Sequence, residues 1–203
     1  MYVSRIGPDP IDIRLDDAAF TAGDQFRASA ASFFARLDRK EERLVERCVD
    51  HASRWRLLPA ARMATRAGNG WLYPIASAVL LLGSFQYAMR CIAAASVSLA
   101  IAFVIYPSLK KIIARQRPCH NNELLSDIAP LDRYSFPSGQ AMTAAAFGVP
   151  IIVAAPLSAL PIAVGGCLLV SWSRMALGHH YLSDIIAGTI IGGGVAALAM
   201  LVI

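Results

Sequence analysis

The first segment whose residues could do chemistry is Lys110–Pro118 (KKIIARQRP). On a helix that continues from the preceding apolar run, Lys110 and Arg117 lie two turns apart and share a face. Pro118 is expected to end that helix and to hold Arg117 at its end. Two cations on one face suit an anion, and a guanidinium can bind phosphate oxygens through two donors. Taken alone, the segment could equally be a basic cluster flanking a membrane span.

The second segment is Ser135–Gln140 (SFPSGQ), immediately before another apolar run. Here Ser138 is predicted to be the N-cap of a helix, and Gly139 leaves the first backbone N–H groups uncovered. Free N–H groups at a helix N-terminus bind phosphate well. An ordinary helix start without a ligand would have the same composition.

The third segment is Ser173–Asp184 (SRMALGHHYLSD). Arg174 closes one apolar run, while His180 and Asp184 have the i, i+4 spacing that lets two side chains meet on one face of a helix. A carboxylate that accepts from one ring nitrogen makes the other a stronger base or nucleophile. Ionisable groups at membrane depth are functional by default, although a His–Asp pair can also be purely structural.

The three segments together form an ordered pattern: Lys-x6-Arg-Pro, then Pro-Ser-Gly, then Ser-Arg-x5-His-x3-Asp. This pattern closely resembles the type-2 phosphatidate phosphatase family of membrane lipid phosphatases, which are relatives of the vanadium haloperoxidases. The resemblance covers about Trp71 to Ile203. It implies a helical bundle that hydrolyses a polyprenyl or phospholipid phosphate or diphosphate without a metal ion or other cofactor.

The resemblance also implies a role for each matching residue. His180 would attack phosphorus to form a phosphohistidine, Asp184 would orient and stabilise His180, and water would then release phosphate. Such a reaction depends mainly on positioning and on electrostatic clamping of the phosphoryl group. The residues that would hold the phosphoryl oxygens are Lys110, Arg117, Ser138, Gly139 and Arg174.

One position departs from the family pattern, because Gln140 stands where the second motif normally ends in His. That His is thought to protonate the leaving oxygen, and a glutamine cannot do so. Another acid such as His120, His179 or water could replace it, or the substrate could be a diphosphate whose leaving phosphate needs little protonation. Alternatively, the chain is a catalytically impaired lipid-phosphate binding or scaffold protein of the same fold.

The elements that must position these segments are apolar. Of 203 residues, 56% are hydrophobic and 16% are charged, which is typical of an integral membrane protein. We expect an all-α, polytopic bundle at 67–203 with about five transmembrane helices, since each of five apolar runs has about the length needed to cross the bilayer. The runs are Trp71–Tyr87, Cys91–Leu109, Gly139–Ala155, Leu157–Leu177 and Ile185–Ile203.

The residues before the bundle are more polar. Residues 1–24 are predicted to be a polar arm, and 25–66 alternate apolar and charged residues near helical spacing. This pattern predicts an amphipathic helix at the membrane surface or against the bundle, ending where Gly68-Asn69-Gly70 breaks the helix. The segment carries no motif that assigns it a function.

The basic residues are distributed asymmetrically. Of 19 Lys and Arg residues, 12 lie in the first 66 positions, and the five predicted spans place only Arg90 on the side opposite the three segments. By the positive-inside tendency, we expect a multi-pass protein of the cytoplasmic membrane whose site faces the cytoplasm.

The expected partners are therefore a lipid phosphate and the bilayer. Basic patches interleaved with aromatic residues are absent, which argues against nucleic-acid binding, and the sequence does not indicate an oligomeric state. No metal site or disulfide framework is predicted, because the four cysteines are scattered without a C-x-x-C pair: Cys48, Cys91, Cys119 and Cys167.

Overall fold

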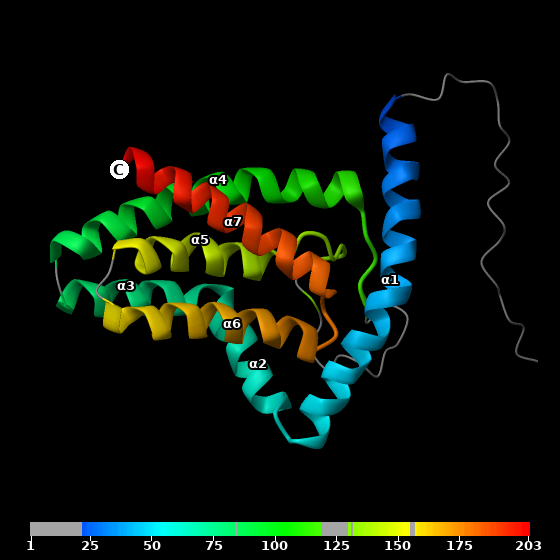
Figure 1. Ribbon diagram of the computed structural model, residues 1–203, viewed down its shortest axis with the longest axis horizontal. Coiled ribbons are helices and arrows are strands. Elements are labelled where there is room, and N and C mark those ends of the chain that lie inside the picture. The colour runs from blue at the N-terminus through cyan, green and yellow to red at the C-terminus, as the bar shows by residue number, and fades with distance from the viewer. Residues whose placement is uncertain (1–21, 84, 119–129, 131, 155–156) are drawn as a thin grey trace, which may run out of the picture.

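The computed structural model describes residues 22–83, 85–118, 130, 132–154 and 157–203. Within these ranges all regular structure is helical, which confirms the predicted all-α class. Figure 1 shows α3 to α7 running side by side, with α1 standing across one end of them. The longer helices are α1 (Ala22–Arg54), α2 (Leu58–Arg66), α3 (Leu72–Gly83), α4 (Phe85–Ile113), α5 (Gly139–Ala154), α6 (Leu160–Ala176) and α7 (Leu182–Val202).

The amphipathic segment forms two helices. The chain breaks after α1 at Arg56, which has a left-handed φ of 54°, and α2 begins with Pro59 in its first turn. Val45 and Val49 of α1 are buried against Tyr181, just ahead of α7. The N-terminal part of α1 leaves large apolar side chains exposed, so its role at the membrane surface stays a prediction. Of the predicted polar arm, residues 1–21 lie outside the described ranges.

A short π-helix, Ala67–Trp71, joins α2 to α3. The predicted break falls inside it, because Gly70 has a φ of 135°, a conformation that favours glycine. The turn presents Asn69 to the start of α5, where its side-chain oxygen accepts a hydrogen bond from Gln140. The glycine-containing turn Ala67–Trp71 therefore lies against the second motif, although the two are remote in the sequence.

The expected boundary between the first two spans was wrong. Arg90 does not interrupt the helix but lies inside α4, which has 29 residues and begins at Phe85. Its side chain is exposed near the helix start, where a long cationic side chain can reach the interface.

The count of five crossing helices stays a prediction. Within the described ranges, α4 and α7 are long and apolar enough to cross a bilayer. The apolar helices α5 and α6 have 16 and 17 residues, and α3 has 12.

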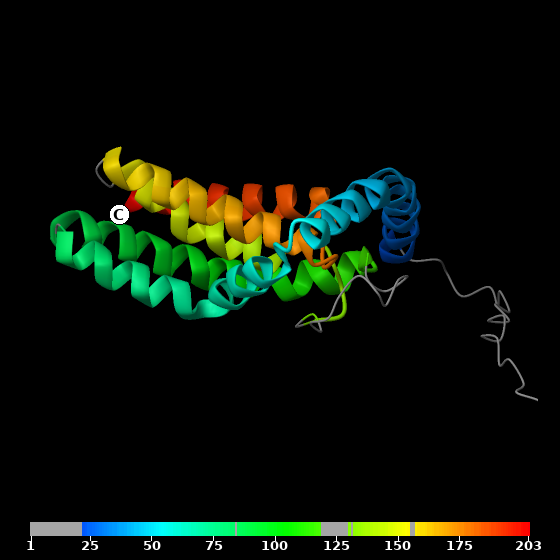
Figure 2. The same cartoon turned by 90° about the horizontal axis from the view of Figure 1, so that it is seen from below.

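The centre of the bundle is the crossing of α5 and α7, which lie against each other in both views (Figures 1 and 2). A Cβ at Gly188 would lie 2.4 Å from the carbonyl oxygen of Ser138, and one at Gly192 would lie 2.0 Å from that of Met142. The two backbones meet because these positions carry no side chain.

Candidate active site

The three sequence motifs converge at the end of the bundle near α1, around a cavity of about 380 Å³. Five of the predicted site residues line it: Arg117, Gly139, Gln140, Arg174 and His180. The other three are buried next to lining residues: Lys110 beside Asp132, Ser138 before Gly139 and Asp184 beside His180. The cavity is also lined by residues that the motifs did not indicate, including Asn69, Tyr73, Tyr106 and Asp132.

The first motif has a different backbone from the one expected. The helix does not reach Arg117, because α4 ends at Ile113 and Ala114 takes a left-handed φ of 50°. Arg117 is instead held in an irregular segment, where Nε donates to the carbonyl oxygen of Asp132 at 3.0 Å and Nη1 to that of His179 at 2.7 Å. Arg117 is thereby fixed by hydrogen bonds rather than by a helix face shared with Lys110.

Asp132 joins the two cations of this motif. Its Oδ1 lies 2.7 Å from Lys110 Nζ and also accepts from Arg117 Nη2, and its Oδ2 accepts from the Tyr106 hydroxyl. Burial opposes ionisation of Asp132, but these donors and charges outweigh it and lower its pKa to about 2. Asp132 is thus an anion bound to the cation pair that the sequence predicted would bind phosphate.

His180 lies in the turn between α6 and α7 and is almost fully buried. Its Nε2 is 3.1 Å from Arg117 Nη1. Because arginine only donates, Nε2 must be the accepting nitrogen, and the ring proton belongs on Nδ1. Burial and the nearby charges of Arg117 and Arg174 lower the pKa of His180 well below its usual range, so the neutral imidazole is favoured.

Asp184 faces the other nitrogen of that ring. Its Oδ2 lies 3.5 Å from His180 Nδ1, longer than the ~2.9 Å of a formed N–H···O bond. The same oxygen accepts from the backbone N–H of Tyr181 at 3.0 Å, which fixes the carboxylate at the start of α7. The predicted His–Asp pair is therefore adjacent, with a gap that a small ring movement would close.

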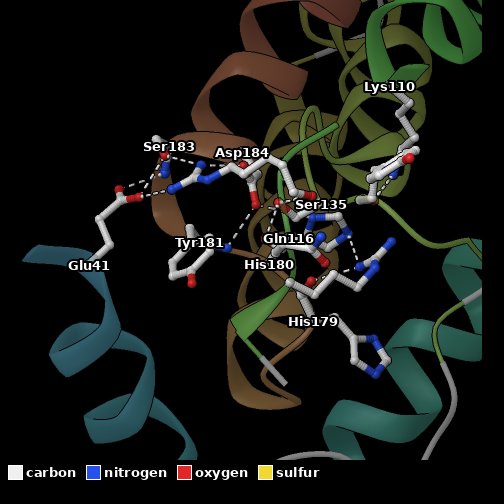
Figure 3. Close-up of polar contacts among 12 residues, drawn as sticks. Glu41, Lys110, Gln116, Ser135, His179, His180, Tyr181, Ser183 and Asp184 are labelled. Atoms are coloured by element: carbon white, nitrogen blue, oxygen red, sulfur yellow. Dashed lines mark hydrogen bonds and ion pairs between the residues drawn. The ribbon is translucent and has the colours of Figure 1, made fainter. Parts of the chain in front are cut away.

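Arg115 is the partner of Asp184 that the motifs did not reveal. Its Nη1 donates to Asp184 Oδ1 and, at 2.7 Å, to Ser183 Oγ. Its Nη2 binds Asp38 at 2.7 Å and Glu41 at 2.9 Å, both on α1. Figure 3 shows Glu41 reaching Ser183 at the first turn of α7, on the opposite side of Asp184 from His180. The N-terminal helix is thus linked to Asp184 through one buried guanidinium.

The second motif has no side-chain cap of the predicted kind. Among the described residues the Ser138 hydroxyl has no hydrogen-bond partner, although it is buried, and the Ser138 N–H donates to the Asp184 carbonyl at 3.0 Å. Position 139 favours glycine, because a Cβ there would lie 2.6 Å from the Tyr106 ring. Ser138 does occupy the predicted N-cap position, because α5 begins at Gly139 and the Ser138 carbonyl accepts from the N–H of Met142, but its hydroxyl does not cap the helix.

Gln140 is held by the segment that precedes α3. Its Nε2 donates to the carbonyl oxygen of Thr65 at 3.1 Å and to Asn69 Oδ1. The Thr65 hydroxyl in turn accepts from Arg174 Nη1 at 3.3 Å. Of the suggested substitute acids, His179 is buried outside the cavity lining, and His120 lies outside the described residues.

A comparison with models of known protein families identifies the family of this chain. The model of the PAP2 superfamily matches residues 92–203, which is more than half of the chain. The chain belongs to the PAP2 superfamily, and the resemblance seen in the sequence is confirmed.

One similar protein is an undecaprenyl-diphosphatase from Sulfolobus acidocaldarius, 31% identical over 106 residues. The match spans 51% of this chain and 51% of that relative, so this chain corresponds to about half of its length.

Two solved structures share the fold. A transmembrane PAP2 type phosphatidylglycerolphosphate phosphatase from Bacillus subtilis has a TM-score of 0.61 and 22% identity, covering 86% of this chain and 94% of that one. The Aquifex aeolicus protein LpxE has a TM-score of 0.56 and 22% identity, covering 71% of this chain and 86% of that one. At this identity the likeness supports the helical architecture.

Proposed function

We propose that this protein is a membrane lipid-phosphate phosphatase that forms a phosphohistidine on His180. The observation that carries the proposal is the position of the His180 ring, with Nε2 beside Arg117 at the cavity and Nδ1 toward Asp184. Membership of the PAP2 superfamily and similarity to an undecaprenyl-diphosphatase support a lipid phosphate or diphosphate as the substrate.

In the binding step, the phosphoryl group enters the cavity between Arg117 and Arg174. The N–H groups of Arg117 that now bind His180 and Asp132 turn to donate to the phosphoryl oxygens. Lys110, which lies beside Asp132, adds a third positive charge. Ser138, whose hydroxyl lacks a protein partner among the described residues, and the Gly139 N–H complete the proposed oxygen contacts. Three cations supply the neutralisation that metal ions provide elsewhere, so the proposed reaction uses no metal ion.

In the first chemical step, the lone pair of His180 Nε2 attacks phosphorus, an N–P bond forms and the bond from phosphorus to the leaving oxygen breaks. Asp184 stabilises the positive charge that develops on the ring through Nδ1–H. Water then attacks the phosphohistidine, the N–P bond breaks, and inorganic phosphate leaves with the neutral imidazole restored.

Gln140 favours a diphosphate substrate in this scheme. Its amide donates to Thr65 and Asn69 and carries no titratable proton for a leaving lipid alkoxide. A leaving lipid monophosphate needs little protonation near neutral pH. We therefore propose a polyprenyl diphosphate ahead of a phosphatidate, in the cytoplasmic membrane and with the site on the cytoplasmic side.

The test is phosphate release in detergent from undecaprenyl diphosphate and from a phosphatidate, by the parent protein and by His180→Ala. Release that is lost in the variant, together with an acid-labile phosphoenzyme in the parent, supports the enzyme. If neither form releases phosphate but both bind the lipid, the alternative holds: a lipid-phosphate binding or scaffold protein of the same fold.

A further inference from the structure

A second hollow lies beside the candidate active site and is almost entirely apolar. It has a volume of about 310 Å³, within the range of pockets that hold small ligands. Its walls come from three helices: Ile75 and Val79 of α3, Phe147 and Ile151 of α5, and Ile162 and Gly166 of α6. We call it the α3–α6 groove.

The groove exists because α3 stands apart from α6. No residue of α3 is buried, and α3 packs on α4, whereas α6 packs on α5 and α2. Figure 1 shows α3 and α6 along the same edge of the bundle, below α5, and Figure 2, seen from below, shows them apart with α5 visible between them. The floor of the groove is therefore α5, and large apolar side chains such as Ile75 and Ile162 are exposed along its two walls.

The groove meets the phosphate cavity at Tyr73, which lines both hollows. The Tyr73 hydroxyl lies 3.0 Å from Thr143 Oγ1 in the cavity wall, and its ring lies 5.2 Å from the ring of Phe147 in the groove. A single side chain thus has its polar end at one hollow and its apolar body at the other.

The direction of the groove fits a lipid. Its α5 residues run from Ala144 to Ile151, away from the site end of the helix, over roughly 10 Å at 1.5 Å per residue. We propose that the α3–α6 groove binds the hydrocarbon chain of the same lipid whose phosphoryl group occupies the cavity. The proposal rests on the proposed function, and it assigns chain-length selection to α3 and α6.

Two adjacent glycines of α6 allow a matched test. A Cβ at either Gly165 or Gly166 would meet no atom within 4 Å, so both positions accept a larger side chain without a backbone clash. Only Gly166 lines the groove. Gly166→Leu should fill the groove, and Gly165→Leu should add the same side chain to the same helix outside it.

The measurement is kcat/KM for undecaprenyl diphosphate and for dimethylallyl diphosphate, whose five-carbon chain is short compared with the roughly 12 Å that separate Gly166 from Arg174 along α6. Gly166→Leu should lower the long-chain value by at least about tenfold, the change expected when roughly two buried methylenes are displaced, and spare the short-chain value. Gly165→Leu should change neither value. An unchanged ratio between the two substrates in Gly166→Leu overturns the proposal.

A second pair, on the opposite wall, decides the matter if Gly166→Leu does not fold. Ala76 lines the groove and Ala78 does not. Ala76→Leu should therefore lower long-chain activity selectively, while Ala78→Leu should not, and equal ratios in these two variants again overturn the proposal.

Failure of the groove and failure of the proposed function can be separated by a binding experiment. A long-chain alkyl phosphonate that carries a diazirine in its chain cannot be hydrolysed and labels whatever the chain touches. Labelling of α3 and α6 residues in the groove, reduced in Gly166→Leu but not in Gly165→Leu, supports the site even in a chain without turnover. Labelling spread evenly over the outer faces of the bundle overturns it.

Discussion

Arg115 and Asp184, 69 residues apart in the sequence, form a buried ion pair through Nη1 and Oδ1. The guanidinium lies between the Phe34 and Tyr181 rings, 4.7 and 4.2 Å from their centroids, which adds cation–π contacts. Asp184 is thus held from one side by Arg115 while its other oxygen faces His180. The proposed orienting carboxylate depends on a cation that α1 helps to position.

Arg115→Lys is predicted to lower kcat by about 10- to 100-fold, because a charged hydrogen bond contributes roughly 1.5–3 kcal/mol and lysine lacks the fork that joins Asp184 to α1. KM should change little, since Arg115 does not line the cavity. Steady-state kinetics with undecaprenyl diphosphate measures both constants. Arg133→Lys, an exposed arginine stacked on Tyr134, is the control and should behave like the parent. A rise in KM with unchanged kcat would assign Arg115 to substrate binding instead.

Asp132→Asn is predicted to tighten vanadate inhibition by about tenfold, equivalent to ~1.4 kcal/mol. The Asp132 carboxylate binds both Lys110 and Arg117, and its pKa of about 2 keeps it ionised throughout the physiological range. It therefore competes with an incoming phosphoryl anion for the same cations. Inhibition constants for orthovanadate give the comparison, with the exposed Asp50→Asn as control. Weaker inhibition would show that Asp132 mainly orients the two cations.

The fold class could be predicted because a long apolar run is a strong local signal. Helix ends could not, since they depend on tertiary context. The predicted runs stop at Tyr87 and resume at Cys91, on either side of Arg90, yet the exposed Arg90 side chain lies on a continuous α4. The chain breaks at Arg56, and α4 ends early at Ala114. Both residues have a left-handed backbone conformation, which neither residue type favours.

The motifs predicted which residues would gather but not what holds them. Arg117, Arg174 and His180 line one cavity because their motifs lie at the same end of adjacent helices. Arg115 and Asp132 were missed, since a charge in the sequence does not reveal its partner, and both are paired with remote segments. The contribution of α1 was missed for the same reason.

Gln140→His is predicted to raise phosphate release from a phosphatidate by about 10²-fold or more, the usual contribution of a general acid. The gain on undecaprenyl diphosphate should be much smaller, because its leaving phosphate is already a weak base. The imidazole can keep a donor to the Thr65 carbonyl that Gln140 now uses. Gln140→Asn is the control for disturbed packing and should gain on neither substrate. Equal gains on both substrates would argue against a diphosphate preference.

The pH dependence of His180 can be measured through its reaction with diethyl pyrocarbonate, which requires a neutral imidazole. Burial and the neighbouring arginines lower the pKa of His180 below 6.5, so the neutral form persists as the pH falls through that value. The rate of inactivation that vanadate protects against should therefore stay constant from pH 8 to about pH 6. A rate that halves near pH 6.5 would contradict the lowered pKa.

Gly192→Ala is predicted to destabilise the bundle, because its Cβ would lie 2.0 Å from the Met142 carbonyl oxygen. That contact is with backbone, so α5 and α7 must separate, and overpacking of this kind costs ~1–3 kcal/mol. Gly194→Ala is the matched control two residues along α7, where a Cβ meets nothing within 4 Å. Thermal unfolding in detergent should show a lower Tm for Gly192→Ala alone.

The same separation of α5 and α7 should also reduce phosphate release at temperatures where the variant is still folded. The reason is that the N–H of Ser138 donates to the carbonyl oxygen of Asp184 across the two helices. A variant with a lowered Tm but parental activity would show that the α5–α7 crossing supports the fold without setting the site.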